Sequence, residues 1–260
     1  MLSGLGVCVL GLAVIWNPFT HVSLDNATVV VPAAMQVTPP SGRDDVLVIV
    51  YSGDGGWADL DKQLGNAFAA RGLPVLGVNT FKYYWRMRTA DESAAQLDAL
   101  MTKYLEQWHK QRVWLVGFSF GADVLPTIID KLSPENRARI AQLVLLSPSR
   151  DFSFEIQFEG YMVSQGRFKA FVKRQLEKFN KVPHYPTLPP VQAMQRQLPV
   201  VCYYGTDDAD ESLCTIAGLP RWIQVYPENG GHHFDGGYAP LAARLIEQLP
   251  ARVAPAVVPH

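Results

Sequence analysis

Short apolar runs recur along the chain in a pattern typical of the strands of a buried, mostly parallel sheet. The segments between them carry apolar residues at helical spacing, as at Leu60, Leu64 and Phe68, and predict amphipathic helices. Strands that alternate with helices predict an α/β domain with helices on both faces of the central sheet. The predicted strands cover residues 28–31, 35–38, 46–51, 73–78, 113–116, 140–146, 199–204 and 221–226.

The N-terminal segment departs from this alternation. Residues 5–16 form an almost uninterrupted apolar stretch, about as long as the core of a signal peptide. No Lys or Arg precedes the stretch and no small-x-small cleavage pattern follows it, so a buried first strand is the alternative. We expect residues 1–26 to be an export signal or membrane anchor, and residues 27–260 to form one domain.

A second departure lies at residues 150–198. The segment opens with alternating phenylalanines, continues through basic residues and ends in a proline-rich passage. Between core strands of an α/β domain, we expect such an insert to overhang the active site as a small cap. The basic residues predict either a solvated surface or a contact with an anionic membrane. They are Lys169, Lys173, Arg174, Lys178 and Lys181.

Composition narrows the class of protein. The chain has 260 residues, of which 48% are hydrophobic and 18% charged, as expected for one globular domain with a substantial core. A net charge of -1 gives no basis for nucleic-acid binding. There is no H-E-x-x-H motif and the three cysteines lack zinc-site spacing, so we expect neither a metal nor another cofactor.

The sequence G-F-S-F-G at residues 117–121 follows an apolar run and precedes residues that can begin a helix. In this strand–turn–helix context the motif predicts Ser119 as a nucleophile on a sharp, strained turn. The two glycines leave room for the turn, and the N-terminus of the following helix favours negative charge beside the serine. A simple turn between strand and helix is the alternative, because the five-residue pattern also occurs by chance.

A glycine-rich loop, S-G-D-G-G-W, follows the run 46–51. In an α/β-hydrolase this loop and the residue after the nucleophile supply the N–H groups of the oxyanion hole. We therefore predict oxyanion donors at Gly53, Asp54 and Phe120. An ordinary turn is the alternative.

Two later loops supply partners for a serine nucleophile in the chain order of an α/β-hydrolase. Asp208 is our first choice for the triad acid, with Asp207 and Asp210 as alternatives in the same loop. His232 and His233 follow two glycines after the last predicted strand. We assign the base to His232, because the glycine directly before it leaves room for the ring to reach the serine, and His233 is the alternative.

An aromatic and basic loop follows the predicted strand 73–78, at the end of a strand where α/β proteins bind ligands. Tyr84, Trp85 and Arg86 are predicted to form a pocket wall, with Arg86 or Arg88 near an anionic headgroup. Packing of this loop against a neighbouring helix is the alternative.

Taken together, these motifs resemble the bacterial virulence proteins VirJ and AcvB over about residues 45–249. The resemblance implies a periplasmic serine hydrolase of the α/β-hydrolase fold that hydrolyses the aminoacyl ester of aminoacyl-phosphatidylglycerol, releasing lysine or alanine. AcvB-like members carry a further N-terminal domain, and we expect the short, VirJ-like form here. The motifs are S-G-D-G-G-W, the Tyr-Tyr-Trp loop, G-F-S-F-G-A-D-V-L-P, C-Y-Y-G-x-D-D-x-D-x-x-x-C and G-G-H-H-F-D-G-G-Y.

In the expected reaction Ser119 attacks the ester, His232 accepts its proton and Asp208 holds the imidazole. The substrate would be an aminoacylated phospholipid or another ester, met at a membrane surface. A carboxylesterase or thioesterase acting on another acyl group and a non-catalytic periplasmic interaction protein are the alternatives.

Cys202 and Cys214 bracket the loop of Asp208. Disulfides persist in exported proteins, so we predict that these two cysteines form a disulfide that pins the loop. Two reduced, buried cysteines are the alternative if the chain stays in the cytosol.

Overall fold

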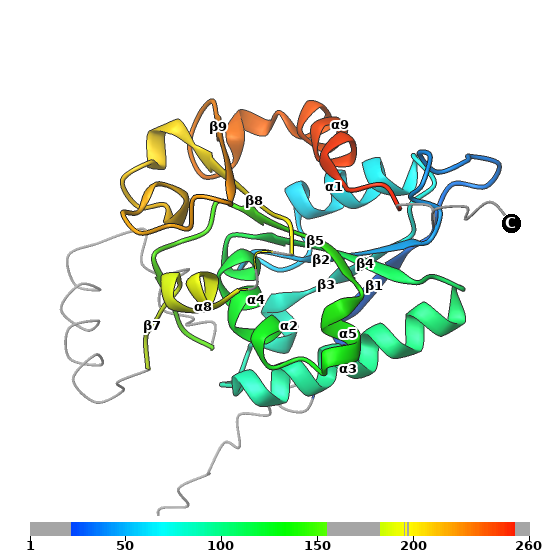
Figure 1. The fold of residues 1–260 in the computed structure, drawn as a ribbon, viewed down its shortest axis with the longest axis horizontal. Coiled ribbons are helices and arrows are strands. Elements are labelled where there is room, and N and C mark those ends of the chain that lie inside the picture. The colour runs from blue at the N-terminus through cyan, green and yellow to red at the C-terminus, as the bar shows by residue number, and fades with distance from the viewer. Residues whose placement is uncertain (1–21, 155–182, 195, 197, 253–260) are drawn as a thin grey trace, which may run out of the picture.

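The structure is a computed structural model that describes residues 22–154, 183–194, 196 and 198–252 (Figure 1). Among these residues, a seven-stranded sheet forms the centre of the molecule. Its strands are β1 (Thr28–Val31), β2 (Val46–Tyr51), β3 (Val75–Val78), β4 (Arg112–Phe118), β5 (Ile140–Leu146), β8 (Val200–Gly205) and β9 (Gln224–Glu228). Their order is β1-β3-β2-β4-β5-β8-β9, with β1 antiparallel to β3 and all other neighbours parallel.

Helices cover both faces of this sheet (Figure 1). One face packs against α1 (Asp59–Ala69) and α9 (Tyr238–Gln248). The opposite face carries α2 (Thr80–Tyr83), α3 (Ala90–Gln107), α4 (Phe120–Asp130), α5 (Pro134–Ala138) and α8 (Leu188–Ala193). A two-stranded sheet of β6 (Asp151–Phe152) and β7 (Tyr185–Pro186) is separate from the central one.

Strand β2 shows why the apolar runs lack alternation. Leu47 and Tyr51 pack into the core beneath α3 and α4, whereas Val48 and Val50 pack beneath α1 and α9. Side chains alternate between the faces of a strand, and both faces are covered here, so every residue of β2 is buried. The predicted α/β architecture, with a mostly parallel sheet between two helical layers, is confirmed.

One predicted strand is wrong. Residues 35–38 form a turn and an irregular segment instead. Gln36 has a left-handed backbone with φ 66°, and the Met35 side chain is 91% exposed. A left-handed residue reverses the direction of the chain, so the segment cannot continue as an extended strand.

The folded unit begins before the predicted boundary at residue 27. Leu24 is 1% exposed and belongs to the core, and its N–H donates to Gln96 Oε1 at 2.7 Å. The predicted signal or anchor lies mostly in residues 1–21, outside the described residues. None of the helices in the described ranges is long and apolar enough to cross a membrane.

Most of the predicted cap, residues 155–182, also lies outside the described residues. Its described ends pack onto the domain. Phe152 and Phe154 are buried, and the Phe154 carbonyl accepts the Arg88 N–H at 3.0 Å. Helix α8 at the other end packs against α4, the helix that follows Ser119.

Candidate active site

Ser119 occupies the sharp turn between β4 and α4. Its backbone has φ 51° and ψ -121°, a positive φ that residues other than glycine rarely adopt. The glycines on either side allow the turn: a Cβ on Gly117 would lie 2.6 Å from the Ala122 nitrogen, and one on Gly121 would lie 2.3 Å from the Tyr51 oxygen. The turn therefore holds the serine at the carboxyl edge of the sheet in a strained conformation.

The imidazole of His232 faces this serine, with Nε2 2.7 Å from Ser119 Oγ. His232 lies on the loop after β9, and two contacts hold that loop in place. The Ser147 hydroxyl donates to the His232 carbonyl at 2.9 Å. Gly205 also lies in backbone contact with the loop, since a Cβ there would be 2.1 Å from the Gly231 oxygen.

The neighbouring His233 does not approach the serine in the same way. Its side chain is exposed, and its ring packs against Phe118 with centroids 5.2 Å apart. The structure therefore brings His232, and not His233, to Ser119.

Asp208 lies beside the histidine loop, at the start of the segment after β8. Its Oδ2 is 3.4 Å from the point that a Cβ on Gly231 would occupy. Asp208 and His232 line the same small cavity of about 100 Å³. The two alternative acids, Asp207 and Asp210, have exposed side chains and do not line this cavity.

The electrostatic environment favours a neutral imidazole. Burial lowers the pKa of His232, and the neighbouring His233 lowers it further. The carboxylates of Asp208, Asp54 and Glu211 oppose this shift without cancelling it. A neutral histidine with Nε2 at hydrogen-bond distance can accept a proton from a serine hydroxyl.

Two of the predicted oxyanion residues, Gly53 and Phe120, lie next to Ser119. A Cβ on Gly53 would lie 3.5 Å from Ser119 Cβ, so the glycine-rich loop touches the nucleophile. Phe120 is the first residue of α4, where the helix offers no carbonyl partner for its N–H. Gly53 is buried, whereas Asp54, whose N–H belongs to the peptide after Gly53, is exposed.

The family model for bacterial virulence protein (VirJ) matches residues 45–253 of this chain. The chain belongs to the VirJ family. The resemblance noted in the sequence is thereby confirmed over most of the chain.

Solved structures similar to this VirJ-family chain include several hydrolases. The Pyrococcus furiosus esterase Pf2001 has a TM-score of 0.55 at 15% identity, covering 78% of this chain and 80% of its own. Est1E from Butyrivibrio proteoclasticus has a TM-score of 0.54 at 11% identity, covering 85% of this chain and 93% of its own. A proline iminopeptidase from Mycobacterium smegmatis has a TM-score of 0.53 at 11% identity, again covering 85% and 93%. At these identities the likeness establishes the α/β-hydrolase fold alone.

A short local match also occurs to the pyruvate synthase subunit PorB of Methanothermobacter thermautotrophicus. It is 38% identical over 59 residues, which are 23% of this VirJ-family chain. The match spans only 20% of that protein's length, and it carries no argument about function.

The aromatic loop of the VirJ-family protein differs from the predicted pocket wall. Tyr84 is 0% exposed and packs edge-on against Phe120 at 5.1 Å, so it supports the site from inside the core. Arg88 is buried and pairs with Glu92, and Arg86 pairs with the same carboxylate at 2.9 Å. Packing, the alternative reading of this loop, holds for Tyr84 and Arg88 because their side chains fill the space beside α3.

Trp85 is half-buried and packs edge-on against Phe81, with centroids 4.9 Å apart. Three residues were predicted to touch substrate, and two of them, Trp85 and Arg86, retain accessible surface. Their contact with substrate stays a prediction.

A disulfide joins Cys202 of β8 to Cys214, with Cα atoms 5.7 Å apart. It closes the segment that carries Asp208 and Glu211 onto the middle of β8. The position of the acidic loop is therefore tied covalently to the sheet.

Sequence reasoning missed Asp123, which lies one helical turn after Ser119 on α4. Asp123 is 4% exposed, and its Oδ1 accepts the Ser149 N–H at 2.6 Å. Burial raises its pKa to about 8, and the charges of Asp151 and Asp54 add to the shift. Its spacing of four residues from the nucleophile was the available signal, since such residues share a helix face.

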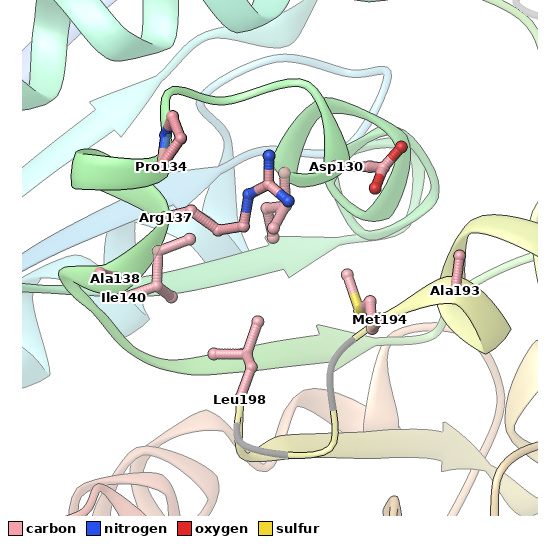
Figure 2. A pocket seen from close by; sticks show the side chains of 9 residues that line it. Asp130, Pro134, Arg137, Ala138, Ile140, Ala193, Met194 and Leu198 are labelled. Atoms are coloured by element: carbon pink, nitrogen blue, oxygen red, sulfur yellow. The ribbon is translucent and has the colours of Figure 1, made fainter.

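A larger cavity of about 640 Å³ lies at the opposite end of β5, where Ile140 begins the strand. In Figure 2, the Arg137 side chain extends from α5 toward α4 across this space. None of the residues that line it belongs to the site around Ser119. No group of three or more His, Cys, Asp or Glu residues suited to a metal ion occurs in the part of the chain that the structure describes.

Proposed function

We propose that this VirJ-family protein is a serine esterase with Ser119 as nucleophile and His232 as general base. The observation that carries the proposal is the 2.7 Å contact between His232 Nε2 and Ser119 Oγ at a strained strand–helix turn. A reactive serine needs a neutral base within hydrogen-bond reach, and the lowered pKa of His232 supplies it.

The reaction then proceeds in two halves. Ser119 Oγ attacks the ester carbonyl while His232 takes its proton, and the N–H groups of Asp54 and Phe120 stabilise the oxyanion. His232 then gives the proton to the alcohol, the alcohol departs, and the acyl group stays bound to Ser119 as an acyl-enzyme. Water activated by the same histidine hydrolyses the acyl-enzyme and regenerates the serine.

Asp208 supports this cycle through its negative charge. The charge raises the pKa of His232 and so favours the imidazolium that forms in each half-reaction. The cavity shared by the two side chains supports the assignment of Asp208 over its neighbours.

As substrate we propose the aminoacyl ester of aminoacyl-phosphatidylglycerol, with a lysyl or alanyl group. Carboxylates surround the reacting centre: Asp54 and Glu211 act on His232, and Asp54 and Asp151 act on Asp123. An aminoacyl ester carries an ammonium group one carbon from its carbonyl, and nearby negative charge attracts it. A neutral fatty acyl group gains nothing from these charges.

The proposed compartment is the periplasm, with the enzyme acting at the membrane surface. An apolar segment at residues 5–16 supports export, and a disulfide between Cys202 and Cys214 suits an oxidising compartment. Fractionation of cells that express the full chain tests this location directly.

The proposed activity is tested with purified protein and vesicles that contain lysyl- or alanyl-phosphatidylglycerol. We expect release of the free amino acid and labelling of the protein by a fluorophosphonate probe. Ser119→Ala should fold normally and lose both, because the reactive oxygen is gone. An active Ser119→Ala variant would overturn the scheme.

The same assay separates the two other functions. Rapid turnover of short acyl esters or thioesters with none of the aminoacyl lipid would establish an esterase or thioesterase of another acyl class. A wild-type protein that is neither active nor labelled would establish the non-catalytic interaction protein.

A further inference from the structure

A buried pair of hydroxyl groups lies beneath the glycine-rich loop that follows β2. Ser52 and Thr80 are both 0% exposed, and their hydroxyl oxygens are 2.9 Å apart. They come together because β2 and β3 are parallel neighbours in which Tyr51 pairs with Val78. The loops after both strands therefore start side by side at the edge of the sheet that carries Ser119.

The carbonyl oxygen of Gly53 is the acceptor at the centre of this network. Thr80 Oγ1 donates to it at 2.5 Å, and the Gly56 N–H donates to it at 3.0 Å. A threonine hydroxyl has one hydrogen, so the contact with Ser52 is then made by the Ser52 hydrogen. Ser52 Oγ in turn accepts the Thr80 N–H at 3.1 Å. Ser52 Oγ also lies 3.1 Å from the Gly53 oxygen, so its hydrogen is shared between Thr80 Oγ1 and that carbonyl. Thr80 Oγ1 lies farther, 3.2 Å, from the Ser52 carbonyl, which makes the Gly53 oxygen its nearer acceptor.

The direction of this carbonyl determines the direction of the Asp54 N–H. The two groups belong to one peptide unit, and in a trans peptide the C=O and N–H point in opposite directions. The described residues contain no cis peptide bond. Because the Gly53 carbonyl points into the buried network, the Asp54 N–H points out of it, on a loop that touches Ser119.

We propose that Thr80 is a positioning residue of the active site, whose hydroxyl holds the Gly53–Asp54 peptide with its N–H directed at the oxyanion. The inference rests on the proposed esterase function. Glycine leaves this peptide free to rotate, and a flipped peptide would present an acceptor oxygen to the negative charge. Thr80 therefore acts on the transition state, where the oxyanion exists, and not on substrate binding.

Thr80→Val tests this role, since it removes the hydroxyl and keeps the branched shape. We expect kcat on a short acyl ester to fall about 10- to 100-fold with KM nearly unchanged, somewhat less than the 10²–10³-fold loss of an entire oxyanion donor. Affinity for a boronic acid that forms a tetrahedral adduct with Ser119 should fall in parallel. Thr80→Ser keeps the hydroxyl, so its kcat and its affinity for the boronic acid should be close to those of the wild type.

Thr28→Val is the matched control. Thr28 Oγ1 also donates to a backbone carbonyl, that of Leu24 at 2.8 Å, but it lies on the edge strand β1. The control loses a threonine-to-carbonyl hydrogen bond of the same kind and should keep the wild-type kcat and boronic acid affinity. A structural role alone for Thr80 predicts the same result for both variants.

Three results would each overturn the proposal. The folded Thr80→Val protein could keep the wild-type kcat, it could change KM alone, or Thr80→Ser could lose as much kcat as Thr80→Val. If Thr80→Val does not fold, Ser52→Ala decides, because it removes the hydroxyl that orients Thr80; unchanged kcat there also overturns it. A wild-type protein that resists fluorophosphonate labelling rejects the esterase function itself. Normal wild-type turnover with an unimpaired Thr80→Val rejects only the role of Thr80.

Discussion

At the residue scale, burial governs the ionisable groups around Ser119. The same cause acts in opposite directions on two of them: it lowers the pKa of His232 and raises that of Asp123 to about 8. In both cases the charged form loses hydration, so the neutral form gains. The site therefore holds a neutral base beside its nucleophile at neutral pH.

The pH dependence of turnover follows from the lowered pKa of His232. The base must be unprotonated, so we expect kcat/KM on a soluble ester to rise with pH and to level off once His232 is neutral. The midpoint should lie below about 6.5, the ordinary value for histidine. Asp208→Asn removes a charge that raises this pKa and should move the midpoint further down, whereas Asp210→Asn should not. A midpoint at or above the ordinary value contradicts the assignment.

The two neighbouring histidines should differ sharply when each is replaced by alanine. His232→Ala removes the group 2.7 Å from Ser119 Oγ, and we expect kcat to fall by several orders of magnitude, up to about 10⁶-fold as for the histidine of another serine hydrolase triad. His233 contacts Phe118 at the surface, so His233→Ala should change stability or KM far more than kcat. Steady-state kinetics on folded variants measure both, and the reverse ranking would assign the base to His233.

At the element scale, the site is assembled from loops at the carboxyl ends of parallel strands. β4 leads to Ser119, β8 to Asp208 and β9 to His232. The strands share a rigid register, so each loop begins from a defined place. The path of each loop beyond the strand can still vary. Contacts between loops restrict this path, and one of them is the hydrogen bond from the Ser147 hydroxyl to the His232 carbonyl.

The disulfide is the covalent restraint on one of these loops. Replacing Cys202 and Cys214 together by alanine should lower the free energy of unfolding by about 2–4 kcal/mol, because an unfolded chain without the bridge gains conformational freedom. It should also lower kcat, since Asp208 lies within the closed segment. Denaturant unfolding and kinetics measure the two effects, with Cys8→Ala as the control that retains the bridge. Mass spectrometry that finds free thiols at both positions in native wild-type protein would disprove the bridge.

At the scale of the whole molecule, the net charge of -1 hides a separation of charge along the chain. Carboxylates gather near Ser119, and a set of lysines and arginines lies at residues 169–181, outside the described residues. In the proposed function the acidic site receives a cationic acyl group, while the basic segment meets an anionic membrane. The two features suit the two ends of one aminoacylated lipid.

The proposed membrane contact predicts a salt dependence confined to lipid substrates. Raising ionic strength should lower kcat/KM on anionic vesicles and leave hydrolysis of a soluble ester nearly unchanged, because salt screens surface charge. Replacing Lys169, Lys173 and Lys178 together by glutamine should reduce the salt effect. A triple replacement of Lys62, Lys110 and Lys131 is the control with equal loss of charge. Equal salt effects on both substrates, or on both variants, would contradict the membrane role of this segment.

Several features of this protein follow from its sequence alone. The buried parallel strands, the turn at Ser119 and the chain order of serine, aspartate and histidine are encoded locally, in apolar runs, paired glycines and the residues beside them. Their signals are short-range: an apolar run indicates a strand buried on both faces, and paired glycines indicate a sharp turn, within a few residues. The strand predicted at residues 35–38 was wrong because the same local pattern does not reveal the turn at Gln36.

Tertiary structure decided the rest. Ser119 and His232 are 113 positions apart, and only the packed sheet brings their side chains within 2.7 Å. Which histidine faces inward, the burial of Tyr84 and the support of Gly53 by Thr80 all depend on contacts between loops that begin on different strands. Such contacts form when the strands align, so no single stretch of sequence contains them.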